Sequence, residues 1–176
     1  MQASATITVK ASPEQVAAMW HDLERLPTFM THLKEVSANG DGRSHWVASA
    51  PAGTEVEWDA EVTEDVPAER MSWRSLQGAS LANSGTVRWV RAPGARGTEV
   101  HVDLSYEPPA GSAGAAVAKL FGEEPNQQLR DDLRRFKQLL ETGEIARSDS
   151  TPTGVRARKS MSRPAQPGGS EEEVAR

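Results

Sequence analysis

The sequence predicts an α+β fold in which a curved antiparallel β-sheet wraps around a long C-terminal helix. Several segments alternate strictly between apolar and polar residues, the pattern of strands with one dry and one wet face. Short turns rich in Gly, Pro and Asn separate these segments, so neighbouring strands are expected to run antiparallel. One stretch near residue 135 instead carries apolar residues at helical spacing, and it is the only predicted element long enough to cover the dry face.

The N-terminal part is expected to contain one strand and two short helices. Residues 6–10 alternate and predict the strand. In Ser12-Pro13-Glu14-Gln15, Ser12 suits the N-cap, Pro13 the first helical position and Gln15 the capping box. The apolar face of the helix that follows consists of Val16, Met19, Trp20 and Leu23. Pro27 interrupts this pattern, and a second short helix is expected around Phe29 and Met30.

About six further strands are expected between residues 36 and 106. The clearest cover residues 54–63 and 99–106, and their apolar positions are Val56, Trp58, Ala60, Val62, Val100, Val102, Leu104 and Tyr106. Shorter alternating pieces surround Met71 and Trp73, Val87 and Trp89, residues 43–50, and Val36. Turns are expected at residues 39–42, 51–53, 66–67, 83–85 and 92–94.

The long helix is predicted over residues 127–141. Its apolar stripe is Leu129, Leu133, Phe136 and Leu140, at spacings of four, three and four. A helical piece is expected before it at residues 113–121, with a break at Glu124-Pro125.

We expect a folded domain over residues 1–145 and a disordered tail over residues 146–176. The tail has few large aliphatic residues and repeats Pro, Gly and Ser, so it cannot bury enough surface to offset its ordering entropy. Its basic cluster, Arg156-Ala157-Arg158-Lys159, is interpreted as part of a solvated segment.

Composition excludes several classes of function. The chain has no cysteine, so disulfides and thiolate chemistry are absent. Its net charge of −5 argues against nucleic acid as a partner. No run of 18 apolar residues and no secretory signal pattern is seen, so a cytoplasmic protein is expected. Transient membrane contact and the oligomeric state stay open.

Several stretches together resemble the START-related, Bet v 1-like superfamily (SRPBCC). They are Trp20 with Pro27, Phe29 and Met30; residues 45–47; 58–62; 66–75; 83–85; 106–108; and 133–137. The similarity is greatest to bacterial proteins of the polyketide cyclase/dehydrase or coenzyme-Q-binding START-type group. It spans residues 3 to 145 and implies a helix-grip fold of about six or seven strands. Members of this superfamily bind or transform very different ligands, so the resemblance implies either ligand binding or catalysis.

The resemblance also implies an apolar cavity between the sheet and the C-terminal helix. The five tryptophans fit this expectation, since four of them lie in predicted strands. The residues expected to line the cavity are Trp20, Phe29, Met30, Trp46, Val56, Trp58, Trp73, Val87, Trp89, Val102, Leu104, Tyr106, Leu129, Leu133 and Phe136. The alternative for each indole is that it fills the core.

Most catalytic chemistries find no support in the sequence. The four histidines form no metal-ligand pair, and no nucleophile motif or phosphate-binding loop is found, so no metal or cofactor is expected. General acid–base catalysis would use Arg74, Tyr106, His45 or Arg88. Alternation directs the two arginines and His45 to solvent, which leaves Tyr106 as the candidate catalytic residue, without an inward partner.

Three functions therefore stay open. The leading one is non-catalytic binding of a hydrophobic small molecule, such as a lipid, an isoprenoid quinone or a polyketide-like compound. The second is a polyketide cyclase or aromatase, which requires at least two polar side chains converging inside the pocket. The third is a protein-interaction or stress-associated module whose cavity is vestigial.

Overall fold

The computed structural model describes residues 1–50, 53–107 and 124–144. The helical piece expected at residues 113–121 and the tail expected at residues 146–176 lie outside the described residues, as does most of the turn at 51–53.

The order of elements follows the prediction. In sequence they are β1 (Gln2–Val9), α1 (Pro13–His21), the 3-10 helix η1 (Leu23–Thr28), β2 (Leu33–Gly40), β3 (Arg43–Ser49), β4 (Glu55–Val66), β5 (Arg70–Ser75), β6 (Ala82–Arg91), the 3-10 turn η3 (Pro93–Ala95), β7 (Thr98–Glu107) and α3 (Pro125–Thr142).

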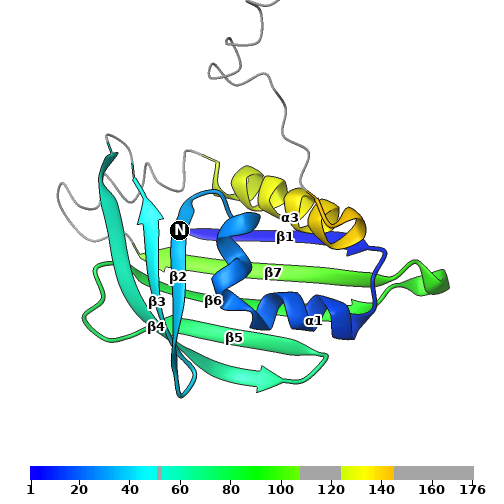
Figure 1. Cartoon of the computed structure of the whole chain (residues 1–176), viewed down its shortest axis with the longest axis horizontal. Coiled ribbons are helices and arrows are strands. Elements are labelled where there is room, and N and C mark those ends of the chain that lie inside the picture. Colours follow the sequence, from blue (N-terminus) through cyan, green and yellow to red (C-terminus); the bar gives the residue numbers. More distant parts are fainter. Residues whose placement is uncertain (51–52, 108–123, 145–176) are drawn as a thin grey trace, which may run out of the picture. The chain divides into compact units, whose positions relative to one another are not determined.

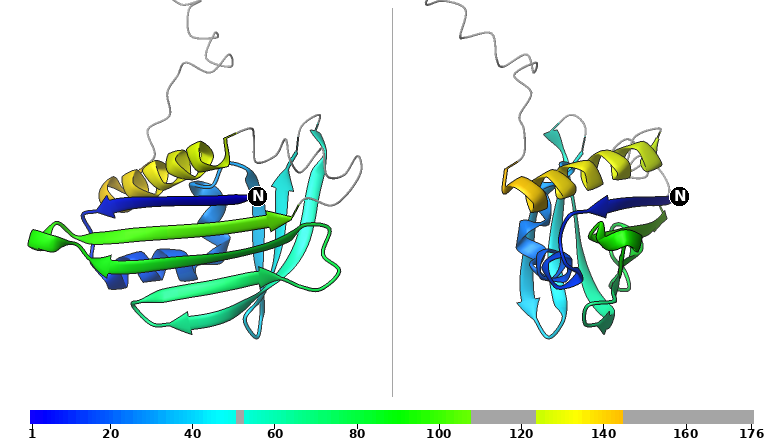
Figure 2. Two further views of the ribbon diagram at one scale, coloured as in Figure 1. Left: turned by 180° about the vertical axis from the view of Figure 1, so that it is seen from behind. Right: turned by 90° about the vertical axis from the view of Figure 1, so that its right-hand side faces the viewer.

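The strands form one antiparallel sheet of seven strands in the order β1-β7-β6-β5-β4-β3-β2. The strands β2–β4 run at a steep angle to β5–β7, so the sheet is strongly curved (Figure 1). Both α1 and α3 lie on the same face of β5–β7 (Figure 2), and α3 packs along β1. This is the predicted helix-grip arrangement.

The start of α1 follows the capping signal in the sequence. The Ser12 hydroxyl accepts a hydrogen bond from the Gln15 backbone N–H at 3.2 Å, and the Gln15 side chain accepts one from the Ser12 N–H at 2.9 Å. These bonds satisfy two donors that a helix start otherwise leaves unpaired, so the entry angle of α1 is fixed locally. The helix then buries Val16 and Trp20 against the sheet.

The core between the helices and the sheet is aromatic. Trp20, Phe29 and Phe136 come from α1, the segment after η1 and α3, and all three are fully buried. Their ring centroids lie 5.2–5.6 Å apart, in tilted and edge-on geometries that aromatic pairs favour. Each such burial contributes about 1.5–3 kcal/mol, so this cluster holds α3 onto the sheet.

Two predicted boundaries were wrong. A turn was expected at Asn83-Ser84-Gly85, but these residues belong to β6. Gly85 lies opposite Trp73 in the neighbouring strand, and a side chain at Gly85 would collide with the indole, so glycine here makes room for a ring rather than a turn. The second short helix, expected around Phe29 and Met30 after an interruption at Pro27, is instead the 3-10 helix Leu23–Thr28, which contains Pro27 and ends before Phe29. The break expected at Glu124-Pro125 falls where α3 begins, a position that suits proline.

Across the described ranges, no helix is both long and apolar enough to pass through a bilayer.

Candidate ligand cavity

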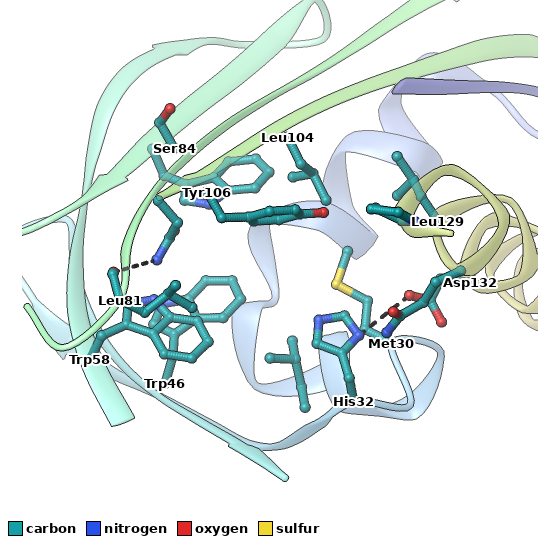
Figure 3. A pocket seen from close by; sticks show the side chains of 15 residues that line it. Met30, His32, Trp46, Trp58, Leu81, Ser84, Leu104, Tyr106, Leu129 and Asp132 are labelled. Atoms are coloured by element: carbon teal, nitrogen blue, oxygen red, sulfur yellow. Dashed lines mark hydrogen bonds and ion pairs between the residues drawn. The ribbon is translucent and has the colours of Figure 1, made fainter. Parts of the chain in front are cut away.

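A cavity lies between the sheet and the first half of α3. Pro125 and Gln128 border it on α3, and residues of strands β2–β7 form its opposite wall. The side chains that line it are Met30, His32, Leu33, Trp46, Trp58, Trp73, Leu81, Asn83, Ser84, Leu104, Tyr106, Pro125, Gln128, Leu129 and Asp132 (Figure 3). The lining is mostly apolar, with a few polar groups.

The enclosed part of this cavity is small. The cavity volume is about 50 Å³. This volume limits the size of a ligand that fits without a change of conformation. It corresponds to roughly four waters at about 10–15 Å³ each. A larger ligand therefore has to displace side chains.

One end of the cavity is a wall of indoles. Trp46 on β3 and Trp58 on β4 are direct cross-strand partners, and their rings stack with centroids 5.9 Å apart at an interplanar angle of 19°. The Trp46 N–H donates to the Ser44 hydroxyl at 2.8 Å. The Trp58 N–H is buried and has no hydrogen-bond partner within the described ranges. The stacked pair offers a flat apolar surface.

The other end contains a buried carboxylate. Asp132 on α3 is 1% exposed, and its Oδ1 accepts a hydrogen bond from Arg135 Nη1 at 3.0 Å and a long one from the Thr31 N–H at 3.5 Å. Arg135 does not line the cavity, so its charge compensates the carboxylate from the solvent side. A buried carboxylate requires such pairing.

His32 approaches the same carboxylate from the sheet side. Its Nδ1 lies 3.5 Å from Asp132 Oδ2, an ion-pair distance when the imidazole is protonated. The turn that carries His32 is fixed by two backbone hydrogen bonds, Leu33 N–H to Met30 O at 3.0 Å and Ser49 N–H to His32 O at 2.9 Å. The position of the imidazole is therefore set by η1, β2 and β3 together.

Tyr106 completes this polar end. Its hydroxyl is directed toward α3, on the side where His32 and Asp132 lie and away from Trp46 and Trp58 (Figure 3). Burial, together with the nearby negative charge of Asp132, raises the pKa of Tyr106 from its ordinary value of 10.0 to about 12. The phenol is therefore a neutral donor and acceptor over the physiological range.

The structure brings seven of the fifteen predicted cavity residues to this cavity, and places the others elsewhere. The seven are Met30, Trp46, Trp58, Trp73, Leu104, Tyr106 and Leu129. Trp20 borders a smaller void beside Trp46 and Trp73. The residues packed in the core are Phe29, Val87, Trp89, Val102, Leu133 and Phe136, and Val56 is half-buried at its edge.

Of the four polar residues considered for acid–base chemistry, three lie on the outer face of the sheet and Tyr106 lies in the cavity. Arg74, Arg88 and His45 pair with acidic residues on the outer face of the sheet, as alternation predicted: with Glu61, Asp103 and Asp59 respectively. The expectation that Tyr106 has no inward polar neighbour was wrong.

Sequence reasoning missed Asp132 and His32 as cavity residues. Asp132 lies three residues after Leu129 and one before Leu133, so the helical periodicity places it at the edge of the apolar stripe. A charged residue in that position was a usable signal. No sequence pattern marked His32, because its location depends on the turn after η1. The described part of the chain brings together no group of three His, Cys, Asp or Glu able to hold a metal ion.

This fold and cavity define a START/Bet v 1-like domain of the SRPBCC type, and sequence comparison narrows the class. Residues 9–134 match the family described as "Polyketide cyclase / dehydrase and lipid transport", and the chain belongs to this family. The family is associated with hydrophobic ligand binding or with polyketide cyclase/dehydrase activity.

Individual relatives agree with this assignment. An uncharacterised 17.2 kDa protein from the melC2–rnhH intergenic region of Streptomyces lincolnensis is 30% identical over 125 residues, covering 69% of this chain and 77% of that protein. The crystal structure of DR_A0006 from Deinococcus radiodurans is 45% identical, covers 82% of this chain and 99% of its own, and has a TM-score of 0.68. A START superfamily protein from Mycobacterium smegmatis shares the fold at 21% identity, with a TM-score of 0.58 over 79% of this chain and 98% of its own.

Proposed function

We propose that this protein binds a hydrophobic small molecule, such as a lipid, an isoprenoid quinone or a polyketide-like compound, in the cavity under α3 without transforming it. The single observation that carries the proposal is an apolar cavity walled by three indoles, Trp46, Trp58 and Trp73, with Tyr106, His32 and Asp132 together on the side of α3. Small-molecule sites are typically concave, apolar and marked by a few placed polar groups.

The small enclosed volume sets a condition on this function. A ligand of more than a few heavy atoms has to displace part of the lining, and the flexible thioether side chain of Met30 is suited to that movement. The stacked pair of Trp46 and Trp58 favours a ligand with a flat apolar part.

Native mass spectrometry of the purified protein tests the proposal, followed by solvent extraction and identification of any bound compound. The expected result is an apolar compound at one per chain that is lost in Trp58→Ala. It should be retained in Val90→Ala, which trims a 47% exposed apolar side chain outside the cavity. An unliganded mass with no thermal shift across fatty acids, quinones and aromatic polyketides would refute ligand binding, and would favour a protein-interaction module.

A second candidate function, polyketide cyclase or aromatase, is favoured by the convergence of Tyr106, His32 and Asp132. These groups face one cavity from a strand, a turn and a helix. An imidazole beside a carboxylate is an arrangement that general base catalysis uses, and a neutral phenol is a hydrogen-bond donor for a developing enolate. Turnover of a poly-β-ketone that is abolished in His32→Gln and Tyr106→Phe, with binding retained, would establish this function in place of passive binding.

A further inference from the structure

We propose that the ligand of this cavity carries a neutral hydrogen-bond donor at one end, the O–H of a phenol, enol or alcohol, which Asp132 receives beside His32 and Tyr106. This inference rests on the proposed ligand binding and specifies the chemistry of its ligand. It makes Asp132 the residue that decides which apolar molecules are retained.

The asymmetry of the cavity supplies the first argument. Trp46 and Trp58 form one end, where their ring faces offer dispersion contacts; the neutral side chains of Asn83 and Ser84 also line the cavity, and the Asn83 amide donates to the Leu81 carbonyl. Asp132, His32 and Tyr106 lie at the other end, next to α3 (Figure 3). A molecule that fits both ends has an apolar body and one polar terminus.

The state of the carboxylate supplies the second argument. Asp132 Oδ1 accepts from Arg135 and the Thr31 N–H, and Oδ2 lies 3.5 Å from His32 Nδ1. A carboxylate is an acceptor with about four lone-pair positions, so it discriminates in favour of molecules that donate. A hydrogen bond to a charged acceptor is stronger than a neutral one, and more so in a site with little water.

A cationic terminus is disfavoured at the same place. Arg135 already compensates the charge of Asp132, with Nη1 at 3.0 Å from Oδ1. An ammonium group would have to be desolvated to reach the cavity, and this cost is not recovered where the anion already has its counter-ion. A neutral O–H keeps the charge balance of the site.

Three probes of matched shape test the inference with the wild-type protein: naphthalene, 2-naphthol and 2-methoxynaphthalene, followed by calorimetry or tryptophan fluorescence. We expect 2-naphthol to bind roughly tenfold to a hundredfold more tightly than the other two, as a hydrogen bond to a charged group implies. The methoxy compound has the oxygen but cannot donate, so it separates donation from polarity. Equal affinities for all three would overturn the inference and leave the proposed ligand binding intact, whereas binding of none would count against both.

Two variants then assign the selectivity to its residue. Asp132→Asn should reduce the preference for 2-naphthol over 2-methoxynaphthalene to about threefold or less, while its affinity for naphthalene stays within about threefold of wild type. Asp131→Asn removes the same charge from a residue of α3 that does not line the cavity, and should change neither ratio. A preference that survives in a folded Asp132→Asn protein would contradict the assignment. If that variant does not fold, the three wild-type affinities still decide the inference.

Discussion

His32 Nδ1 lies 3.5 Å from Asp132 Oδ2, which connects the turn before β2 to the middle of α3 across the cavity. The two residues are separated by 100 positions in the chain, and neither lies in a recognisable motif. The carboxylate of Asp132 therefore lines the apolar cavity and also pairs with Arg135 on α3.

The first prediction concerns the compensation of that charge. Arg135→Gln should lower the free energy of unfolding by about 1–3 kcal/mol, because it weakens the pairing of a carboxylate that is 1% exposed. Arg134→Gln is the matched control, since its partner Asp131 is at the surface, and it should cost less than about 1 kcal/mol. Urea unfolding measures both, and equal effects would show that Asp132 does not need Arg135.

The second prediction concerns the ring of Trp73. Gly85→Ala should destabilise the protein by about 1–3 kcal/mol, because the added methyl collides with the indole on the neighbouring strand. The double variant Trp73→Ala/Gly85→Ala should be no less stable than Trp73→Ala alone, since the collision is then absent. Additive losses in this cycle would argue that the cost of Gly85→Ala comes from the backbone instead.

The third prediction concerns Tyr106, the only tyrosine in the chain, so that phenolate absorbance reports this residue alone. Its pKa should be found near 12, because burial and the charge of Asp132 both raise it. Asp132→Asn should lower this pKa but leave it above 10.0. The unfolded chain loses this proton first, so the contribution of Tyr106 to stability should be constant below pH 10.0 and should fall between there and about pH 12. A midpoint near 10.0 in the folded protein would place Tyr106 outside the cavity.

The fourth prediction concerns a surface pair between α1 and β4. Burial alone lowers the pKa of His21, but hydrogen bonds to the Asp65 carboxylate and to the Ala17 carbonyl outweigh it, so the pKa of His21 is raised above 6.5. The resulting stabilisation should be complete below pH 6.5 and disappear as the pH rises through the pKa of the folded state. Asp65→Asn should abolish most of this dependence. Imidazole titration by NMR measures the shift, and a value at or below 6.5 would contradict it.

Most of the fold was predictable because its signals are local. The alternation in β4 and β7, the Ser12–Gln15 capping box and the stripe on α3 depend on spacing within one element. The turn wrongly expected at residues 83–85 shows the limit of local signals. Gly85 lies within a strand, and a side chain there would collide with the Trp73 ring on the neighbouring strand. Glycine marks either a turn or a close approach, and only the pairing of strands distinguishes them.

The cavity was harder to predict than the fold. The alternation pattern correctly predicted that Trp58, Leu104 and Tyr106 point inward. Residues that fill the core and residues that line the cavity both point inward, so the pattern does not distinguish them. Phe136 and Trp89, for example, point inward but are packed in the core instead of lining the cavity. The distinction depends on how closely α3 approaches the sheet at each level, which no spacing within one element encodes.

The most direct measurement uses the five indole N–H signals in an NMR titration with 2-naphthol. Trp46, Trp58 and Trp73 line the cavity, whereas Trp89 is buried in the core away from it. Binding in the cavity predicts saturable shifts of the first three signals and little change at Trp89. Shifts at all five signals alike, or at none, would contradict the claim that this cavity takes a hydrophobic ligand.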